Sequence, residues 1–155
     1  MMMKLYLDTE FNGFGGDLIS MALVGETFPH SLAGSVTSEF YHAVLCKAPI
    51  DPWVQEHVMP HLNAVPLMPY LFRAEFHDFI KRFANPEIIC DWHADAEHFC
   101  RMLAGPDYGT SLDFACRITI LNTPPGQPVS EIPHNAMEDA RALKRWHQDA
   151  LRSVA

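Results

Sequence analysis

The chain has 155 residues, of which 48% are apolar and 19% charged, and its formal net charge is −8 at pH 7. This length and composition are those of a globular protein with a substantial core, so we expect residues 1–155 to form one domain. The acidic balance disfavours tight, sequence-independent binding to a long nucleic-acid duplex, which depends on many contacts between Lys or Arg and phosphate.

The sequence lacks the features of a membrane-bound or disulfide-bonded protein. No apolar run is long enough to span a membrane, and the segment before Asp8 is too short for the apolar region of a signal peptide. Cys46, Cys90, Cys100 and Cys116 show no Cys-x-x-Cys spacing, so we interpret them as buried thiols in a reducing compartment. We therefore expect a cytoplasmic protein.

The first third of the chain predicts three strands. The apolar runs 4–7, 18–24 and 39–45 are bounded by Gly, Pro or Ser, as strands commonly are. Their short connections predict an antiparallel meander. Asp51 and Pro52 then predict the start of a short helix, with an acidic N-cap and a proline at the first helical position.

The rest of the chain alternates helices and strands. Residues 70–83 predict an amphipathic helix, followed by a strand at 87–90, a helix at 95–103, a strand-like stretch at 112–120 and a helix at 135–151. The apolar stripe of the first of these helices consists of Phe72, Phe76, Phe79, Ile80 and Phe83. The residues of the last helix that we expect to face the core are Ala136, Ala140, Leu143, Trp146 and Ala150. This order predicts a mixed α/β sheet of five strands, three antiparallel and then two parallel, flanked by helices.

Asp8 and Glu10 follow the first predicted strand with one residue between them. Side chains at i and i+2 of a strand point the same way, so we expect both carboxylates on one face. Like charges this close resist joint ionisation, and a divalent cation between them would remove the repulsion. Taken alone, a solvated acidic strand end explains the pair equally well.

Two later segments add further acids and a histidine. Asp95 lies at the start of a predicted helix, where an acid also complements the helix dipole. Asp91 lies nearer the end of the preceding strand and is an alternative to Asp95. At the last helix, His134 lies at the entrance and Asp139 follows five residues later, beside the predicted core position Ala140.

These residues suit hydrolysis of a phosphodiester with the help of two metal ions. Carboxylate oxygens favour Mg²⁺ or Mn²⁺, and two such ions about 3.5–4 Å apart can stabilise both the attacking and the leaving oxygen. Histidine titrates near neutrality, so His134 could accept the proton of the attacking water. We therefore predict a site made of His134 and the metal ligands Asp8, Glu10, Asp95 and Asp139.

In this order and spacing, the motifs resemble those of the DnaQ-like (DEDDh) 3′–5′ exonucleases of the ribonuclease H-like superfamily. Residues 8–10 match the Asp-x-Glu of the first motif, and residues 134–140 match the His-x-Ala-x-x-Asp-Ala of the third. Asp95 occupies the place of the acid in the middle motif, although Cys-Asp replaces the usual His-Asn and Ala replaces the usual Phe. Residues 53–62 are similar to a small bacterial subgroup of single-domain exoribonucleases.

The resemblance implies a ribonuclease H-like fold and a role for each polar residue. Asp8, Glu10 and Asp139 would hold one Mg²⁺ or Mn²⁺ ion, Asp8 would bridge to a second, and Asp95 would complete the site. His134 would be the general base. The implied reaction releases nucleoside 5′-monophosphates from the 3′ ends of single strands, of RNA or of short oligonucleotides.

The resemblance also implies how the substrate end is bound. Thr9, Glu10, Phe11 and Asn12 would contact the 3′-terminal nucleotide, with Phe11 stacking on its base. A homodimer is a candidate assembly, because dimers are common among the resembling proteins and exposed aromatic side chains such as Trp53 could serve one.

Three alternatives use the same residues differently. The first is a proofreading-type DNA exonuclease, since the sequence leaves the choice between RNA and DNA open. The second is an inactive nucleic-acid-binding or scaffold protein of the same fold, which clustered carboxylates without a metal would only destabilise. The third is a phosphatase with Asp8 as nucleophile, which would usually have Asp in place of Glu10 and a lysine further along the chain.

Overall fold

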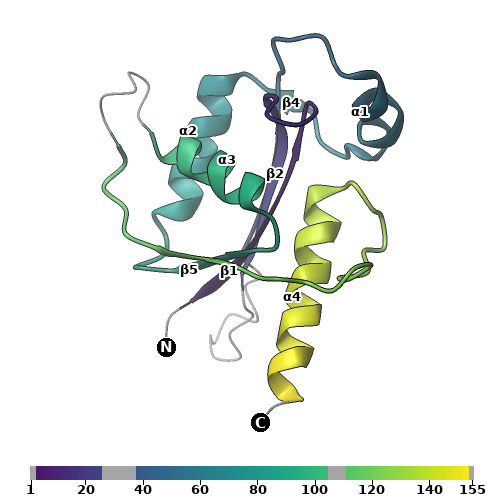
Figure 1. Ribbon diagram of the computed structural model, residues 1–155. Helices are drawn as coiled ribbons and strands as arrows, with labels where there is room; N and C mark the ends of the chain where they lie inside the picture. Colours follow the sequence, from purple (N-terminus) through teal and green to yellow (C-terminus); the bar gives the residue numbers. More distant parts are fainter. Residues whose placement is uncertain (1–2, 26–37, 105–110, 154–155) are drawn as a thin grey trace.

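The centre of the fold is a mixed sheet of six strands, flanked by helices on both faces (Figure 1). The structure is a computed structural model that describes residues 3–25, 38–104 and 111–153. The strands lie in the order β4-β3-β2-β1-β5-β6. Their bounds are β1 Lys4–Phe11, β2 Leu18–Gly25, β3 Glu39–Val44, β4 Pro66–Leu67, β5 Glu87–Cys90 and β6 Arg117–Ile120. The helices in the described ranges are α1 Pro52–His57, α2 Pro69–Ile80, α3 His93–Leu103 and α4 Ala136–Arg152, with a 3₁₀ turn η1 at Met59–His61.

The antiparallel meander predicted for the first three strands is confirmed. β1 pairs with β2 from Leu5 to Phe11, and β2 pairs with β3, both antiparallel. On the other side, β5 pairs with β1 and β6 pairs with β5, both parallel. The sheet is therefore antiparallel in one half and parallel in the other, with β1 at the boundary.

The predicted number of five strands is wrong, because β4 adds a sixth. This two-residue strand pairs in parallel with Ala43 and Val44 at the edge of the sheet. Its proline is tolerated there because an edge strand need not donate every backbone N–H to a neighbour. A strand this short has no alternating pattern, so the sequence gives no signal for it. The strand-like stretch 112–120 is also shorter than predicted, since β6 begins at Arg117.

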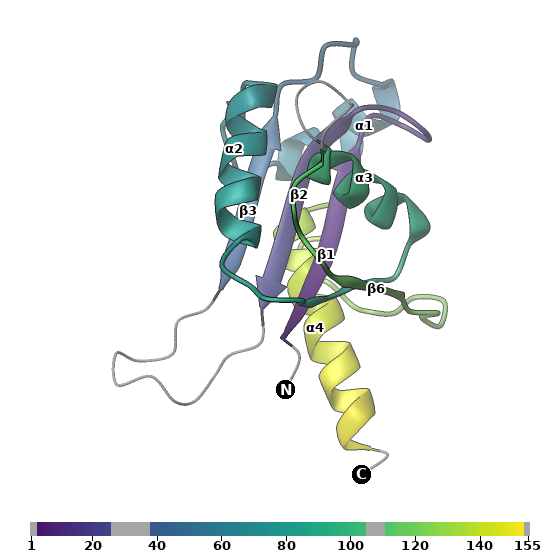
Figure 2. The same cartoon turned by 90° about the vertical axis from the view of Figure 1, so that its left-hand side faces the viewer.

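The larger part of the core lies between the sheet and the helices α2 and α3, which cover one face (Figure 2). The predicted phenylalanine stripe is confirmed: Phe72, Phe76 and Phe79 are buried, and Phe83 packs against the same cluster. Ring contacts with Phe40 of β3 join this stripe to the sheet.

Helix α4 lies on the opposite face and approaches the sheet closely through alanines. Ala136 and Ala140 are fully buried against Ala22 and Val24 of β2. Side chains this small allow the helix backbone to come near β1 and β2, so polar groups of the helix can reach those of β1. Ala150, predicted to face the core, is exposed because it lies beyond the part of the helix that the sheet covers.

The turn after β1 links the sheet to helix α1. Gly16 must be glycine, because a Cβ there would lie 1.9 Å from the carbonyl oxygen of Asn12. The side chain of Asn12 donates to the carbonyl of Pro49 at 2.9 Å and accepts from the backbone N–H of Asp51 at 2.7 Å. Asp51 in turn caps α1 by accepting from the N–H of Trp53, as the sequence predicts. The end of β1 and the start of α1 are thus held together.

No helix in the described ranges combines the length and the apolar character that crossing a lipid bilayer requires.

Replacing Ala140 with Leu should destabilise the protein, because the added methylenes have no room between α4 and β2. We expect Ala140→Leu to lower the free energy of unfolding by about 1–3 kcal/mol, measured by urea denaturation. Ala150→Leu on the exposed part of the same helix is the control, and should change it by less than about 0.5 kcal/mol. Equal losses in the two variants would contradict the close approach of α4.

Candidate metal centre

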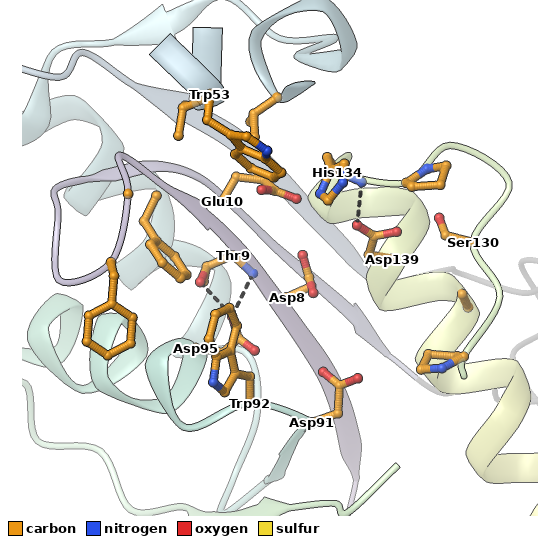
Figure 3. A pocket seen from close by; sticks show the side chains of 18 of the residues that line it. Asp8, Thr9, Glu10, Trp53, Asp91, Trp92, Asp95, Ser130, His134 and Asp139 are labelled. Atoms are coloured by element: carbon orange, nitrogen blue, oxygen red, sulfur yellow. Dashed lines mark hydrogen bonds between the residues drawn. The ribbon is translucent and has the colours of Figure 1, made fainter. Parts of the chain in front are cut away.

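Asp8 and Glu10 lie within β1 and face α4, on one side of the sheet (Figure 3). The strand does not end at residue 7 as predicted, because β2 pairs with it as far as Phe11. Asp8 lies opposite Ala22 and Glu10 opposite Ser20. The small neighbours on β2 leave both carboxylates open toward the helix.

Asp91 and Asp95 lie near Asp8, on the segment that follows β5. The last paired residues of the parallel strands β1 and β5 are Tyr6 and Ile89, so Asp8 and Asp91 each follow by two positions at the same edge. Asp95 lies in the first turn of α3, which begins at His93 rather than at residue 95. Both acids that the sequence offers for the middle motif are therefore present.

Asp95 is only 2% exposed and is held by Thr9. Its Oδ1 accepts a hydrogen bond of 2.6 Å from the Thr9 hydroxyl and one of 3.1 Å from the Thr9 N–H. That N–H is available because the pairing of β1 with β5 stops at Tyr6. Both bonds use the same carboxylate oxygen, so Thr9 fixes the position of Asp95 through Oδ1.

Asp139 and His134 come from α4 and the turn before it. Asn135 caps the helix by accepting from the N–H of Glu138, and it donates to the carbonyl of His61. His134 adopts a left-handed backbone conformation with φ of 64°, and its N–H donates to Asp139 Oδ2 at 3.0 Å. The five-residue spacing of the motif thus has a structural reason, because the acid holds the backbone of the histidine.

The acids form two groups that share Asp8. One group is Asp8, Glu10 and Asp139, and the other is Asp8, Asp91 and Asp95. In each group, one carboxylate oxygen from every residue lies within 4.8 Å of the others. Among the described residues no Cys or His belongs to either group, and an all-oxygen donor set suits a hard cation such as Mg²⁺ or Mn²⁺.

Burial and mutual repulsion make these carboxylates hard to ionise together. Burial, and then the charges of Asp139 and Asp95, raise the pKa of Glu10 to about 8. Burial, joined by repulsion from Asp91, raises the pKa of Asp95 to about 7, against the opposing hydrogen bonds from Thr9. The pKa of Asp8 is raised well above its ordinary value by burial and by the surrounding acids. A cation would relieve this repulsion by stabilising the charged forms.

The acids line a cavity of about 960 Å³ whose rim is aromatic. Phe11, Phe14, Trp53 and Trp92 line it, and Trp53 and Trp92 are 51% and 46% exposed. The ring centroids of Phe11 and Trp92 are 5.6 Å apart. Trp53 meets the ring of His134 edge to face at 5.2 Å. Flat, partly exposed rings next to an acidic floor can stack on planar groups of a ligand.

All of the predicted site residues except Asn12 line this cavity. The structure thus brings Asp8, Thr9, Glu10, Phe11, Asp95, His134 and Asp139 together. Asn12 does not line the cavity, and its side chain is bonded to residues 49–51.

Several lining residues were not predicted from the sequence. The sequence predicts Trp53 only as an exposed aromatic side chain. It predicts no role for the proline-rich loop at residues 124–133, before α4. Residues 126–130 of this loop form the wall next to Asp139. The sequence gives no signal for this wall, because the position of the loop depends on the path between β6 and α4.

Comparison of the chain with protein-family models and with curated proteins finds no match. Conclusions about function therefore rest on the geometry of this cavity and on the motifs that line it.

The carboxylate cluster should make the metal-free protein less stable at higher pH. Glu10 and Asp95 hold protons in the folded state up to about pH 8 and 7, whereas their ordinary pKa values are 4.5 and 3.8. Between about pH 4 and 8 the folded state therefore binds more protons than the unfolded one, and the free energy of unfolding falls as pH rises. Melting temperatures in chelator should drop by several degrees from pH 5.5 to 8.

Mn²⁺ should restore this stability, and more at pH 8 than at pH 5.5, because binding requires ionised carboxylates. Asp8→Asn, which removes the shared ligand, should abolish most of the stabilisation by Mn²⁺. Asp78→Asn, an exposed acid on α2, is the matched control and should respond as the unmodified protein does. Mn²⁺ stabilisation that survives Asp8→Asn would exclude this cluster as the binding site.

Proposed function

We propose that the protein is a metal-dependent 3′–5′ exonuclease of the DnaQ-like (DEDDh) type with a ribonuclease H-like fold. It hydrolyses phosphodiester bonds from the 3′ end of single-stranded nucleic acid, RNA or short oligonucleotides, and releases nucleoside 5′-monophosphates. The observation that supports this most is the arrangement of the acidic residues in two sets of three that share Asp8, with His134 on the wall of the same cavity. The order and spacing of the three motifs agree with this reading.

Two divalent cations, Mg²⁺ or Mn²⁺, are the cofactors of this proposal. Asp8, Glu10 and Asp139 would hold one, and Asp8 with Asp95 would hold the other, with Asp91 as an additional ligand. When bound, such ions activate water and stabilise the charge that develops on the phosphate oxygens. The raised carboxyl pKa values support the assignment, because the cluster is strained electrostatically without a cation.

His134 is the general base. Its backbone is held by Asp139 and its ring lies against Trp53, so the imidazole is placed beside the acids rather than in bulk solvent. Neutral imidazole accepts the proton of the attacking water as its oxygen bonds to phosphorus. The bond to the 3′ oxygen of the preceding nucleotide breaks, that oxygen takes a proton from solvent to become the new 3′-hydroxyl, and the nucleoside 5′-monophosphate is released.

The aromatic rim binds the terminal nucleotide. Phe11 is held by ring contacts to Trp92 and His98, and Trp53 stacks on His57 at 4.6 Å. Bases stack on such rings regardless of sequence, so the enzyme trims ends without a strong base preference. Asn12 contributes indirectly, by fixing α1 and Trp53 next to the end of β1. An unpaired end satisfies this geometry because its base can leave the stack.

The decisive experiment uses 5′-labelled single-stranded RNA and DNA with Mn²⁺ or with chelator. We expect a ladder that shortens from the 3′ end, disappears in chelator, and is lost in Asp8→Asn. Asp78→Asn should cleave as the unmodified protein does. Preference for DNA would favour a proofreading-type nuclease. Binding without cleavage of either polymer would indicate an inactive binding protein and would exclude the proposal.

Replacing His134 with Ala should lower kcat by roughly 10²–10⁴, because the general base is lost. Stabilisation by Mn²⁺ should persist, since the carboxylates remain. His93→Ala on the exposed start of α3 is the matched control. An unchanged kcat in His134→Ala would remove this residue as the base.

A further inference from the structure

A second cavity adjoins the metal centre along helix α4. Its volume is about 400 Å³, and it shares Gln127, Val129 and Ala142 with the first cavity. The shared residues belong to the loop before α4 and to the helix itself. The two cavities therefore adjoin at these three residues, and we call the surface from the acids to the side of α4 the groove.

The outer part of this groove offers one cation and one aromatic ring. Arg145 and Trp146 line it, one turn beyond Ala142. Trp146 is partly buried and packs against Tyr6, Ile89 and Leu143, so its ring is held in place. Arginine and a fixed aromatic ring are the two groups that proteins commonly use to hold phosphate and base of an unpaired strand.

Arg145 is the cation of this helix that faces the groove. Arg141 forms ion pairs with Glu39 and Glu138 at 2.7 and 2.6 Å. Lys144 donates a hydrogen bond to the carbonyl of Gly25. Arg145 has only a long contact of 3.9 Å to Glu131, whose side chain is 76% exposed. Exposed pairs of this kind contribute little, so a phosphate can displace Glu131.

One acid also lines the outer groove and opposes an anionic ligand. Asp149 lies there, and its carboxylate accepts from Arg152 at 3.2 Å. This pairing reduces the repulsion that a phosphate would meet. The groove can therefore hold a chain with few phosphates, which agrees with a net charge of −8 that disfavours tight binding along a long duplex.

The groove and the aromatic rim lie on different sides of the acids. In Figure 3, Ser130 of the groove loop lies beyond Asp139, away from Trp92. If the terminal nucleotide lies against the aromatic rim and its phosphate lies at the acids, the preceding nucleotides extend toward Ser130 and α4. We propose that the groove lined by Gln127, Val129, Arg145 and Trp146 binds the one to three nucleotides upstream of the scissile phosphate. This inference rests on the proposed exonuclease function and adds where the rest of the strand lies.

The test compares a substrate that has an upstream strand with one that has none, and follows how each variant changes the ratio between them. One is an eight-nucleotide single-stranded RNA, and the other is thymidine 5′-monophosphate p-nitrophenyl ester, which has no upstream nucleotide. For Arg145→Gln we expect the ratio of kcat/KM for the octamer to that for the ester to fall by roughly fivefold. The slope of log KM against log salt should become shallower by about 0.7, as for one lost phosphate contact.

Trp146→Leu should lower the same ratio by about tenfold through lost stacking. Because Trp146 is partly buried, urea denaturation checks that this variant is folded, and Arg145→Gln tests the groove independently of packing. Arg101→Gln is the matched control: Arg101 lies on α3, pairs with Glu97, and does not line the groove. This control removes one positive charge and should leave both the ratio and the salt slope as they are.

The outcomes separate the groove from the proposed function. If the unmodified protein cleaves neither substrate, the exonuclease function fails. If it cleaves both, and Arg145→Gln and Trp146→Leu keep its ratio and salt slope, the groove is excluded while the function stands. A loss of equal size on the two substrates would also exclude the groove, because it would show an effect on the metal centre or on folding.

Discussion

Repulsion among partly buried carboxylates around Asp8 is the constraint on which the rest of this structure depends. Several parts of the fold act to hold these groups together against it. The parallel ends of β1 and β5 bring Asp8 and Asp91 to one edge, and Thr9 fixes Asp95 with two hydrogen bonds. A fold that gathers such charges stores unfavourable electrostatic energy unless a cation neutralises it.

The close approach of α4 to the sheet is the second condition for this cluster. Ala136 and Ala140 against Ala22 and Val24 set the distance between helix and sheet. Asp139 is placed at the start of the helix, where it can both face Asp8 and Glu10 and accept from the backbone of His134. One residue thereby couples the position of His134 to that of the acids. Changes in the packing of α4 should consequently move His134 and Asp139 together.

Much of this arrangement can be predicted from the sequence, for identifiable physical reasons. The phenylalanine stripe of α2 has a helical period, and Asp8 and Glu10 share a face because side chains of a strand alternate. The cap at Asp51 follows from local chemistry. Features that depend on the path of the chain through space were missed. They are the edge strand β4 and the wall formed by residues 126–130.

The link between Asn12 and Asp51 has a consequence for the entrance of the cavity. Because this amide joins the end of β1 to the cap of α1, the two sides of the entrance that carry Phe11 and Trp53 move as one body. This part of the entrance is therefore formed during folding, before a ligand arrives, which lowers the ordering cost of binding. Under the proposed function, selection among chain ends would depend on how well they fit this preformed entrance.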